Sequence, residues 1–241
     1  MSRLSAVIVF LAGLVPAVAS AQAPGQGPPM PMAVDLTKVP VGTWAEYTVT
    51  MGQLPPMTTR MALVNKGVLE TTVEGGMMAQ IGGKMALQMT LAPGGEKEGK
   101  VQKMVMQMGS ADPMEFPVTP GQQQFNKPNP KTLVKEESVT VKGGTFKTKH
   151  YRDKTPTGDT VDYWISEKVL PLGLVKMEAE QKQNPNIKGP IKFELTTTGK
   201  DAKVAITKPA KPFDQGMMLQ QMTGGMKGGA APPPAAPAPK K

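Results

Sequence analysis

The sequence predicts an all-β protein: a curved antiparallel sheet, an open or half β-barrel of about ten strands, with short helical turns and disordered termini. Between residues 36 and 208, apolar and polar side chains alternate with a period of two, the period of a strand with one buried face. Turn residues separate the alternating runs at short intervals, and helical periodicity is rare. Such one-sided strands favour a sheet that curls around its own apolar face.

The first 21 residues resemble a secretory signal peptide. Arg3 provides the positive start, residues 4–18 are nearly all apolar, and Ala19-Ser20-Ala21 is a small-x-small cleavage sequence. The apolar run is shorter than the roughly 20 residues that span a bilayer, which favours a cleaved signal over a membrane anchor. We therefore expect a periplasmic or secreted protein of the bacterial envelope, cut near Ala21, with no transmembrane segment after cleavage.

Two further segments differ in composition from the alternating region. Residues 22–35 are rich in Pro and Gly and predict a disordered leader, whereas residues 209–241 predict a flexible tail rich in Met, Gly, Pro and Ala. The β domain is therefore expected over residues 36–208, which is long enough to bury one core.

Charge and cysteine content exclude several classes of function. The net charge of the chain is +9, and it falls to +8 when Arg3 leaves with the signal. This charge fits contact with an anionic envelope surface, although it also serves solubility. The absence of Cys excludes disulfide scaffolds, thiol nucleophiles and thiolate metal sites. The bases are spread out and aromatic residues are few, so we expect no nucleic-acid binding.

Five runs carry the strand pattern most clearly. Each places its apolar residues on one face and its polar residues on the other, and Gly or Pro turns such as Gly75-Gly76 separate the runs. The expected apolar positions are Ala45, Tyr47, Val49 and Met51; Met85, Leu87, Met89 and Leu91; Met104, Met106 and Met108; Val161, Tyr163 and Ile165; and Ile191, Phe193 and Leu195.

Residues 143–180 concentrate the unusual side chains, including the only His and one of the two Trp. We expect a strand over 145–152, a turn, a second strand over 160–166 and a returning strand over 172–180. His150 and Trp164 fall in the register opposite to Tyr163. A catalytic or metal-bound His needs partners, and only Asp153 and Asp162 could lie near it across the hairpin. The sequence therefore predicts no catalytic residue, no metal site and a structural or surface His150.

This region also carries a resemblance to a known family. The order "GTF-x-T-x-H-Y", "D-x-W-I-S" and "x-P-L-G-L-V-K" resembles the C-terminal half of bacterial periplasmic β-proteins related to the lipoprotein-localisation carriers. The early "VPVGTWAEYTV" is similar to the first strand of uncharacterised envelope families with the same half-barrel shape. Ser166 stands where an acid is often found, and less helix is evident than in the carriers. The resemblance, over residues 40–200, implies an unclosed barrel whose concave face receives acyl chains in relatives of known function.

Methionine is the most unusual component, with 19 residues in tight sets. Flexible thioethers fill irregular cores, form adaptable apolar grooves and also suit Cu(I), so three interpretations stay open. Strand alternation favours a core or a groove. The candidate ligand-binding residues are Met85, Leu87, Met89, Met104, Met106 and Met108.

Together these observations predict a non-enzymatic exported envelope protein that binds a lipid, lipoprotein acyl chains or another apolar ligand on a Met-lined concave face, without a cofactor. One alternative is a structural or interaction protein whose tail contacts the cell wall or a partner. A further alternative is Met-based copper binding.

Overall fold

The computed structural model describes residues 30–80, 83–92, 100–118, 125–155, 158–180 and 189–214. The predicted signal peptide, the leader up to residue 29 and the tail from residue 215 lie outside these ranges. The described chain is mainly β, as predicted, and its helical elements are short 3-10 turns: η1 (Leu36–Lys38), η2 (Gly76–Gln80) and η4 (Pro130–Thr132).

Most of the strands follow one another as antiparallel neighbours. The first group comprises β2 (Trp44–Met51), β3 (Leu54–Asn65), β4 (Val68–Gly75), β5 (Lys84–Leu91), β6 (Val101–Met108) and β7 (Met114–Phe116). The second comprises β9 (Leu133–Val141), β10 (Gly144–Lys154), β11 (Thr160–Ile165), β12 (Leu174–Ala179) and β13 (Ile191–Gly199). Short strands complete the set: β1 (Met30–Pro31), β8 (Phe125–Asn126) and β14 (Lys211–Pro212).

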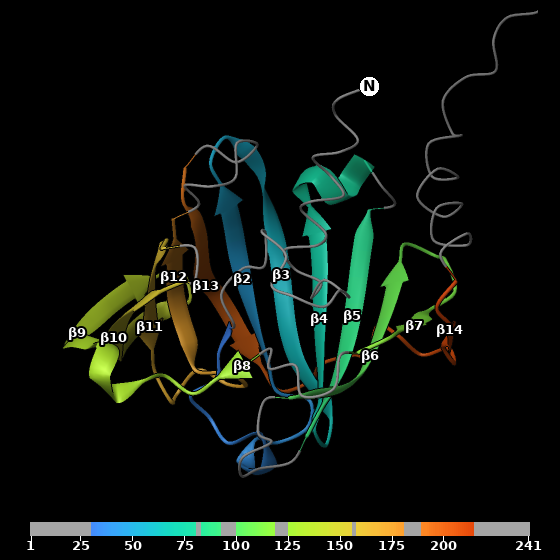
Figure 1. Ribbon diagram of the computed structural model, residues 1–241, viewed down its shortest axis with the longest axis horizontal. Helices are drawn as coiled ribbons and strands as arrows, with labels where there is room; N and C mark the ends of the chain where they lie inside the picture. The colour runs from blue at the N-terminus through green and yellow to red at the C-terminus, as the bar shows by residue number, and fades with distance from the viewer. Residues whose placement is uncertain are drawn as a thin grey trace, which may run out of the picture.

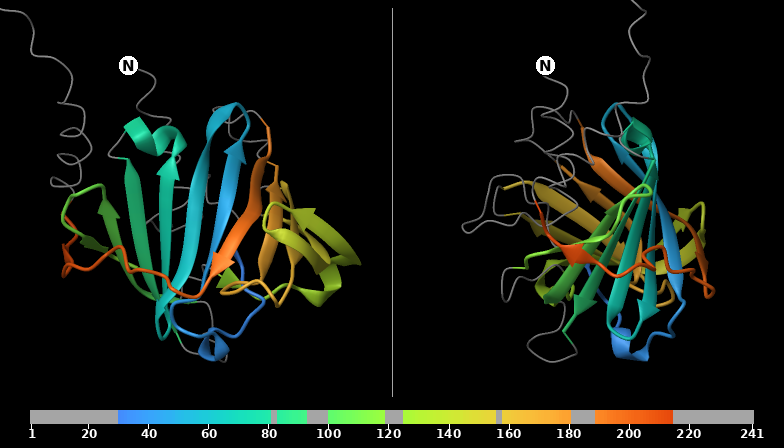
Figure 2. Two further views of the ribbon diagram at one scale, coloured as in Figure 1. Left: turned by 180° about the vertical axis from the view of Figure 1, so that it is seen from behind. Right: turned by 90° about the vertical axis from the view of Figure 1, so that its right-hand side faces the viewer.

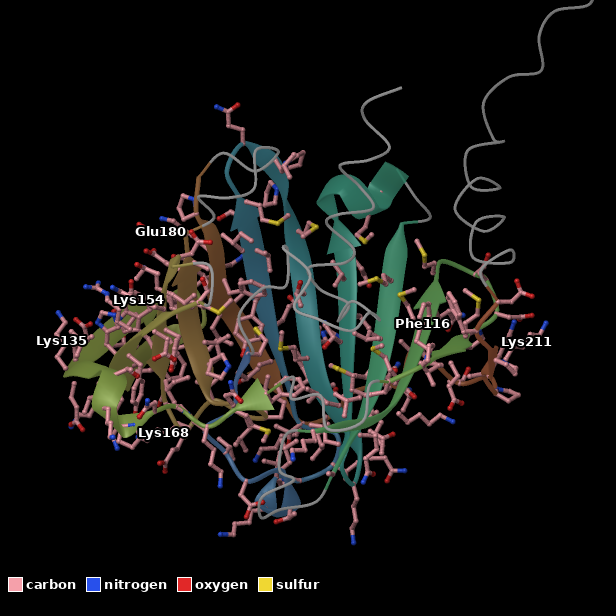
Figure 3. The ribbon with its side chains drawn as sticks, in the orientation of Figure 1. Phe116, Lys135, Lys154, Lys168, Glu180 and Lys211 are labelled. Carbon is pink, nitrogen blue, oxygen red and sulfur yellow. The ribbon has the colours of Figure 1, made fainter. Side chains whose placement is uncertain are left out.

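Twelve of these strands form one sheet in the order β14-β7-β6-β5-β4-β3-β2-β13-β12-β11-β10-β9. The two groups join where β13 pairs antiparallel with β2, so the last long strand of the chain lies beside the first. The sheet curves strongly without closing into a barrel, as the views from front, back and side show (Figure 1, Figure 2). Phe116 and Lys211 mark one end of the sheet, and Lys135, Lys154 and Lys168 mark the other (Figure 3).

The β9 end of the sheet curls back on itself. In the sheet order, β9 lies four places from β13, yet the backbone N–H of Gly143, in the β9–β10 turn, donates to the carbonyl of Leu195 in β13 over 3.0 Å. Val139, Phe146 and Trp164 pack partly buried against the main core. The last five strands therefore form a tighter curl than the rest of the sheet.

The predicted alternation of apolar side chains is confirmed. Tyr47 and Leu195 are fully buried, Met85 is 1% exposed, and most buried apolar residues of the long strands join in one cluster on the inner side of the curve. We call this side the concave face. Paired residues of an antiparallel sheet point to the same side, so register places Tyr163 and Met177 there and Trp164 on the opposite, outer face.

Both predicted segment boundaries need correction. Residues 30–35, expected in the disordered leader, form β1 and the start of η1, and Met32 is only 2% exposed because it packs into the core. Residues 209–214, expected in the flexible tail, include β14, which pairs in parallel with β7. Composition could not show either contact, because in each case the partner strand lies about 90 or more residues away in the chain.

A C-terminal strap, residues 200–214, runs along the outer face. Near its start the Trp44 indole donates to Asp201, and near its end the Phe213 ring lies 4.7 Å from that of Phe116. In its middle, Ile206 packs on Ala86 and Val105, two residues whose side chains point away from the concave face. The strap thus covers apolar positions that one-sided alternation does not predict.

Candidate functional site

The six candidate residues lie opposite one another on two neighbouring strands. In the β5–β6 ladder Met85 pairs with Met108, Leu87 with Met106 and Met89 with Met104. All six belong to the concave-face cluster, and their exposed fractions run from 1% at Met85 to 8% at Met108. The alternation in the sequence predicts which side of each strand is apolar. The ladder brings the two Met-bearing sides together as one surface.

Other thioethers extend this surface along the sheet. They come from the N-terminal segment, from the turn η2 and from strands on both sides of β5–β6, and all belong to the same cluster: Met32, Met51, Met57, Met61, Met78, Met114 and Met177. Unbranched side chains with three rotatable bonds change shape at low cost, so a face rich in Met can repack around objects of different outline.

Two short strands close over part of the concave face. β1 and β8 pair through two residues each, and Phe125 of β8 is buried in the cluster. Backbone N–H groups fix the segment that follows β1: Met32 donates to Asn126 over 2.8 Å and Ala33 to Leu172 over 2.9 Å.

Two tyrosine hydroxyls of the concave face are hydrogen-bonded within the protein, whereas the buried Thr59 hydroxyl beside Tyr47 has no partner among the described residues. The Tyr47 hydroxyl donates to the carbonyl of Leu174 over 3.0 Å, and burial raises the pKa of Tyr47 far above its usual value. The Tyr163 hydroxyl donates to Asp153; burial, followed by this hydrogen bond, raises the pKa of Tyr163 as well. These two phenols stay neutral, so they add no charge to the apolar face.

An open groove lies at the β10 end of the same face. It has a volume of about 720 Å³ and runs between the β9–β10 hairpin, residues 127–128, residues 165–168 and Ala33. Lys147 and Lys149 alternate with Thr148 along β10, and Lys149 is paired with Ile165, a buried residue of the concave cluster. Both lysines are exposed, and they project from the concave side of the sheet.

His150 lies at the centre of a cluster on the outer face. Its Nε2 atom is 2.6 Å from Asp162, its ring stacks on Trp164 with centroids 4.4 Å apart, and the Lys176 ammonium lies 4.9 Å from the centroid of the Trp164 ring. The prediction that His150 and Trp164 face away from Tyr163 is confirmed. Asp162 contacts His150, whereas Asp153 is bound by Tyr163 instead.

Glu137 ties this cluster to the edge strand β9. Its carboxylate accepts from the Trp164 indole over 2.9 Å and forms an ion pair with Lys135 over 3.0 Å, and these two contacts hold the pKa of Glu137 below its usual range. The Nδ1 atom of His150 lies 3.6 Å from Glu137, is buried and has no hydrogen-bond partner. The cluster joins β9, β10 and β11 through side chains.

The chemistry available to this cluster is narrow. Asp162 is held by His150 and Arg152, and the Thr148 hydroxyl, on the same face of β10 as His150, donates to the carbonyl of Glu137. Among the described residues, no group of three or more His, Cys, Asp or Glu side chains is placed to hold a metal ion. We read the cluster as a packing contact between strands.

Comparisons with known proteins give limited information. No family model matches the chain, and no curated protein matches it. A solved structure described as an exported protein with a YmcC-like fold, from Bacteroides fragilis, has 12% identity and a TM-score of 0.29, over 71% of this chain and 99% of that one.

Two other solved structures are similar to the same extent. One, described as a lipoprotein from Parabacteroides distasonis, has 15% identity and a TM-score of 0.30, over 69% of this chain and 99% of that one. The other, described as a hypothetical protein from Chlamydia trachomatis, has 11% identity and a TM-score of 0.29, over 74% of this chain and 96% of that one. None of the three is described as a lipoprotein-localisation carrier, and at these values the likeness carries no argument about function.

In the ranges that the structure describes, none of the helical elements has the length and apolar character needed to cross a bilayer.

Proposed function

We propose that this chain is a non-enzymatic protein of the bacterial envelope that binds an apolar ligand, such as the acyl chain of a lipid, on its concave face. The observation that carries the proposal is the composition and cover of that face. It is lined by Met and Leu pairs across β5 and β6, and β1, β8 and irregular segments pack over it.

A core without a ligand role would not need these features together. Met fixes one packing arrangement of a core less well than Leu or Ile does, because its side chain adapts to many shapes. The cover strands β1 and β8 contribute two residues each to their pairing. A ligand that displaced this cover would exchange one set of apolar contacts for another, at little net cost in buried area.

Native mass spectrometry of protein purified from envelope membranes tests this proposal. We expect a population carrying a lipid-sized mass that organic extraction removes and that added fatty acid restores. Protein that carries no extra mass, and that takes up no fatty acid after extraction, would contradict it.

A second candidate function has one supporting observation of its own. The strap fixes residues 200–214 on the outer face, so the tail that follows starts from a defined point beside β7. A tail anchored in this way suits contact with the cell wall or a partner protein. Deleting residues 215–241 tests this candidate: loss of envelope association with an unchanged melting temperature would support it, and unchanged association would rule it out.

A further inference from the structure

The groove beside β10 differs from the rest of the concave face in charge. From β2 to β7 the inward-facing side chains are apolar apart from the uncharged Thr59 and Thr71, whereas along β10 the same side presents Lys147 and Lys149 before Tyr151. Lys127 and Lys168 line the groove from its other walls. The face therefore changes from apolar to cationic within a few strands.

Three lysines of the groove form no ion pair with a described acid, although Glu136 lies opposite Lys149 in the β9–β10 ladder. Among the described residues, no carboxylate lies within ion-pair distance of Lys147, Lys149 or Lys168. Glu136, Glu137 and Glu167 also line the groove, but the Glu137 carboxylate is engaged by Trp164 and Lys135. The lining carries four lysines against three glutamates, and this formal excess of one positive charge favours an anion in the groove.

The floor of the groove is continuous with the apolar face. Tyr151 and Ile165 line it, are 8% and 4% exposed, and belong to the concave cluster. Ala33, from the segment that follows β1, forms part of the wall and packs against the same cluster. A ligand seated in the groove would thus meet ammonium groups above and the edge of the apolar core below.

We propose that this groove binds the anionic headgroup of a phospholipid whose acyl chain enters the concave face beside Tyr151 and Ile165. This inference rests on the function proposed above and adds a headgroup class and an orientation to it. A neutral lipid gains only the apolar contacts, whereas an anionic one also gains ion pairs with the lysines.

The proposal also places the acyl chain within the sheet. Neighbouring strands lie about 4.8 Å apart, and an acyl chain of one bilayer leaflet covers about 15 Å, so a tail anchored at β10 spans about three strands. Its first contacts are then Met177 of β12 and Phe193 of β13, both buried in the cluster. The Met pairs of β5–β6 lie farther along the same face.

Equilibrium binding of two acyl-labelled probes tests the proposal on the full mature chain. The probes are phosphatidylglycerol and phosphatidylcholine with identical chains, and the variant is K147Q/K149Q/K168Q. We expect the unaltered protein to prefer phosphatidylglycerol. Three exposed ion pairs are together worth about tenfold in affinity, so the variant should lose about that factor for phosphatidylglycerol and none for phosphatidylcholine.

A matched control removes the same charge elsewhere. Lys66, Lys200 and Lys203 are exposed and lie outside the groove, so K66Q/K200Q/K203Q should leave both affinities unchanged. K147R/K149R/K168R should retain the preference, because it keeps the charge. Glycerol phosphate without a chain should compete only weakly.

The outcomes separate the two proposals. Equal affinity for both probes, or equal losses in the groove and control variants, would overturn the headgroup site and leave apolar binding intact. Tight binding of glycerol phosphate without an acyl chain would mean that the groove binds a free phosphate, and would overturn the proposal that it binds a lipid headgroup. Absence of binding by either probe would overturn the proposed function and the headgroup site with it.

Discussion

Methionine side chains decide how firmly the concave face is packed. Met106 is 2% exposed and lies opposite Leu87 across the ladder. If the face is filled at rest, truncation leaves a cavity. We expect Met106→Ala to lower the free energy of unfolding by about 2–5 kcal/mol and the volume-conserving Met106→Leu to lower it by less than about 1.5 kcal/mol, by urea denaturation. A negligible effect of Met106→Ala would mean that the side chain lines an open space.

The buried tyrosines predict a loss of stability at high pH. Burial raises the pKa of Tyr47 and Tyr163 above the usual value of about 10. The folded state therefore keeps protons that the unfolded state loses, so their contribution to stability is complete below about pH 10 and declines as the pH rises beyond it.

Lysines also lose their charge at high pH, so the Tyr47→Phe variant is needed to measure the contribution of Tyr47 alone. The variant loses the hydrogen bond to Leu174, which is worth about 1 kcal/mol. It also loses the buried hydroxyl whose ionisation favours the unfolded state at high pH. Urea titrations at pH 8 and pH 11 should show a smaller alkaline loss in the variant than in the unaltered protein. An equal loss in both would rule out Tyr47 as a source of the alkaline sensitivity.

At the scale of elements, the C-terminal strap is held by one buried carboxylate. Glu70 is 2% exposed and accepts hydrogen bonds from the backbone N–H groups of Ala205 and Ile206 and from the Gln88 amide. A carboxylate in this position replaces the partners that the strap's backbone would otherwise find in water. Acid and strap lie more than 130 residues apart, so the contact could not be read from the sequence.

Removing that carboxylate should loosen the strap. Glu70→Ala leaves two partly or fully buried N–H groups without an acceptor, at a cost of about 1–3 kcal/mol each when unsatisfied. We expect lower stability and faster hydrogen exchange at Ala205 and Ile206. Glu74→Ala, which removes only an exposed ion pair with Lys84, is the matched control and should change little. Equal effects of the two substitutions would contradict the role given to Glu70.

At the scale of the whole molecule, the fold class and the inner faces of the strands were predictable, because the period-two pattern is local and strong in segments such as Trp44–Met51 and Lys84–Leu91. The outer-face positions of His150 and Trp164 followed from the same alternation. The contacts of β1, β14 and Glu70 were not predictable, because each depends on a distant partner. The groove was missed for another reason: Lys147 and Lys149 look like any exposed strand residues until their register against Ile165 is known.

The curl of the β9–β13 end gives the molecule two different surfaces for binding. The Met-bearing face is buried, so ligand entry requires the cover formed by β1 and β8 to move. The groove is already open and carries the charge. We therefore expect a ligand to bind first at the groove and then to enter the apolar face.

The most direct test of this account labels the methionine methyl groups with carbon-13 and follows their NMR signals during a titration with a single-chain phospholipid. The account predicts saturable shifts at methionines of the concave face, led by Met177 and followed by Met85, Met104 and Met106, while the signals of Met217, Met218 and Met222 stay unchanged. Shifts confined to Met217, Met218 and Met222, or no saturable shift at the concave-face methionines, would show that this face does not bind an apolar ligand.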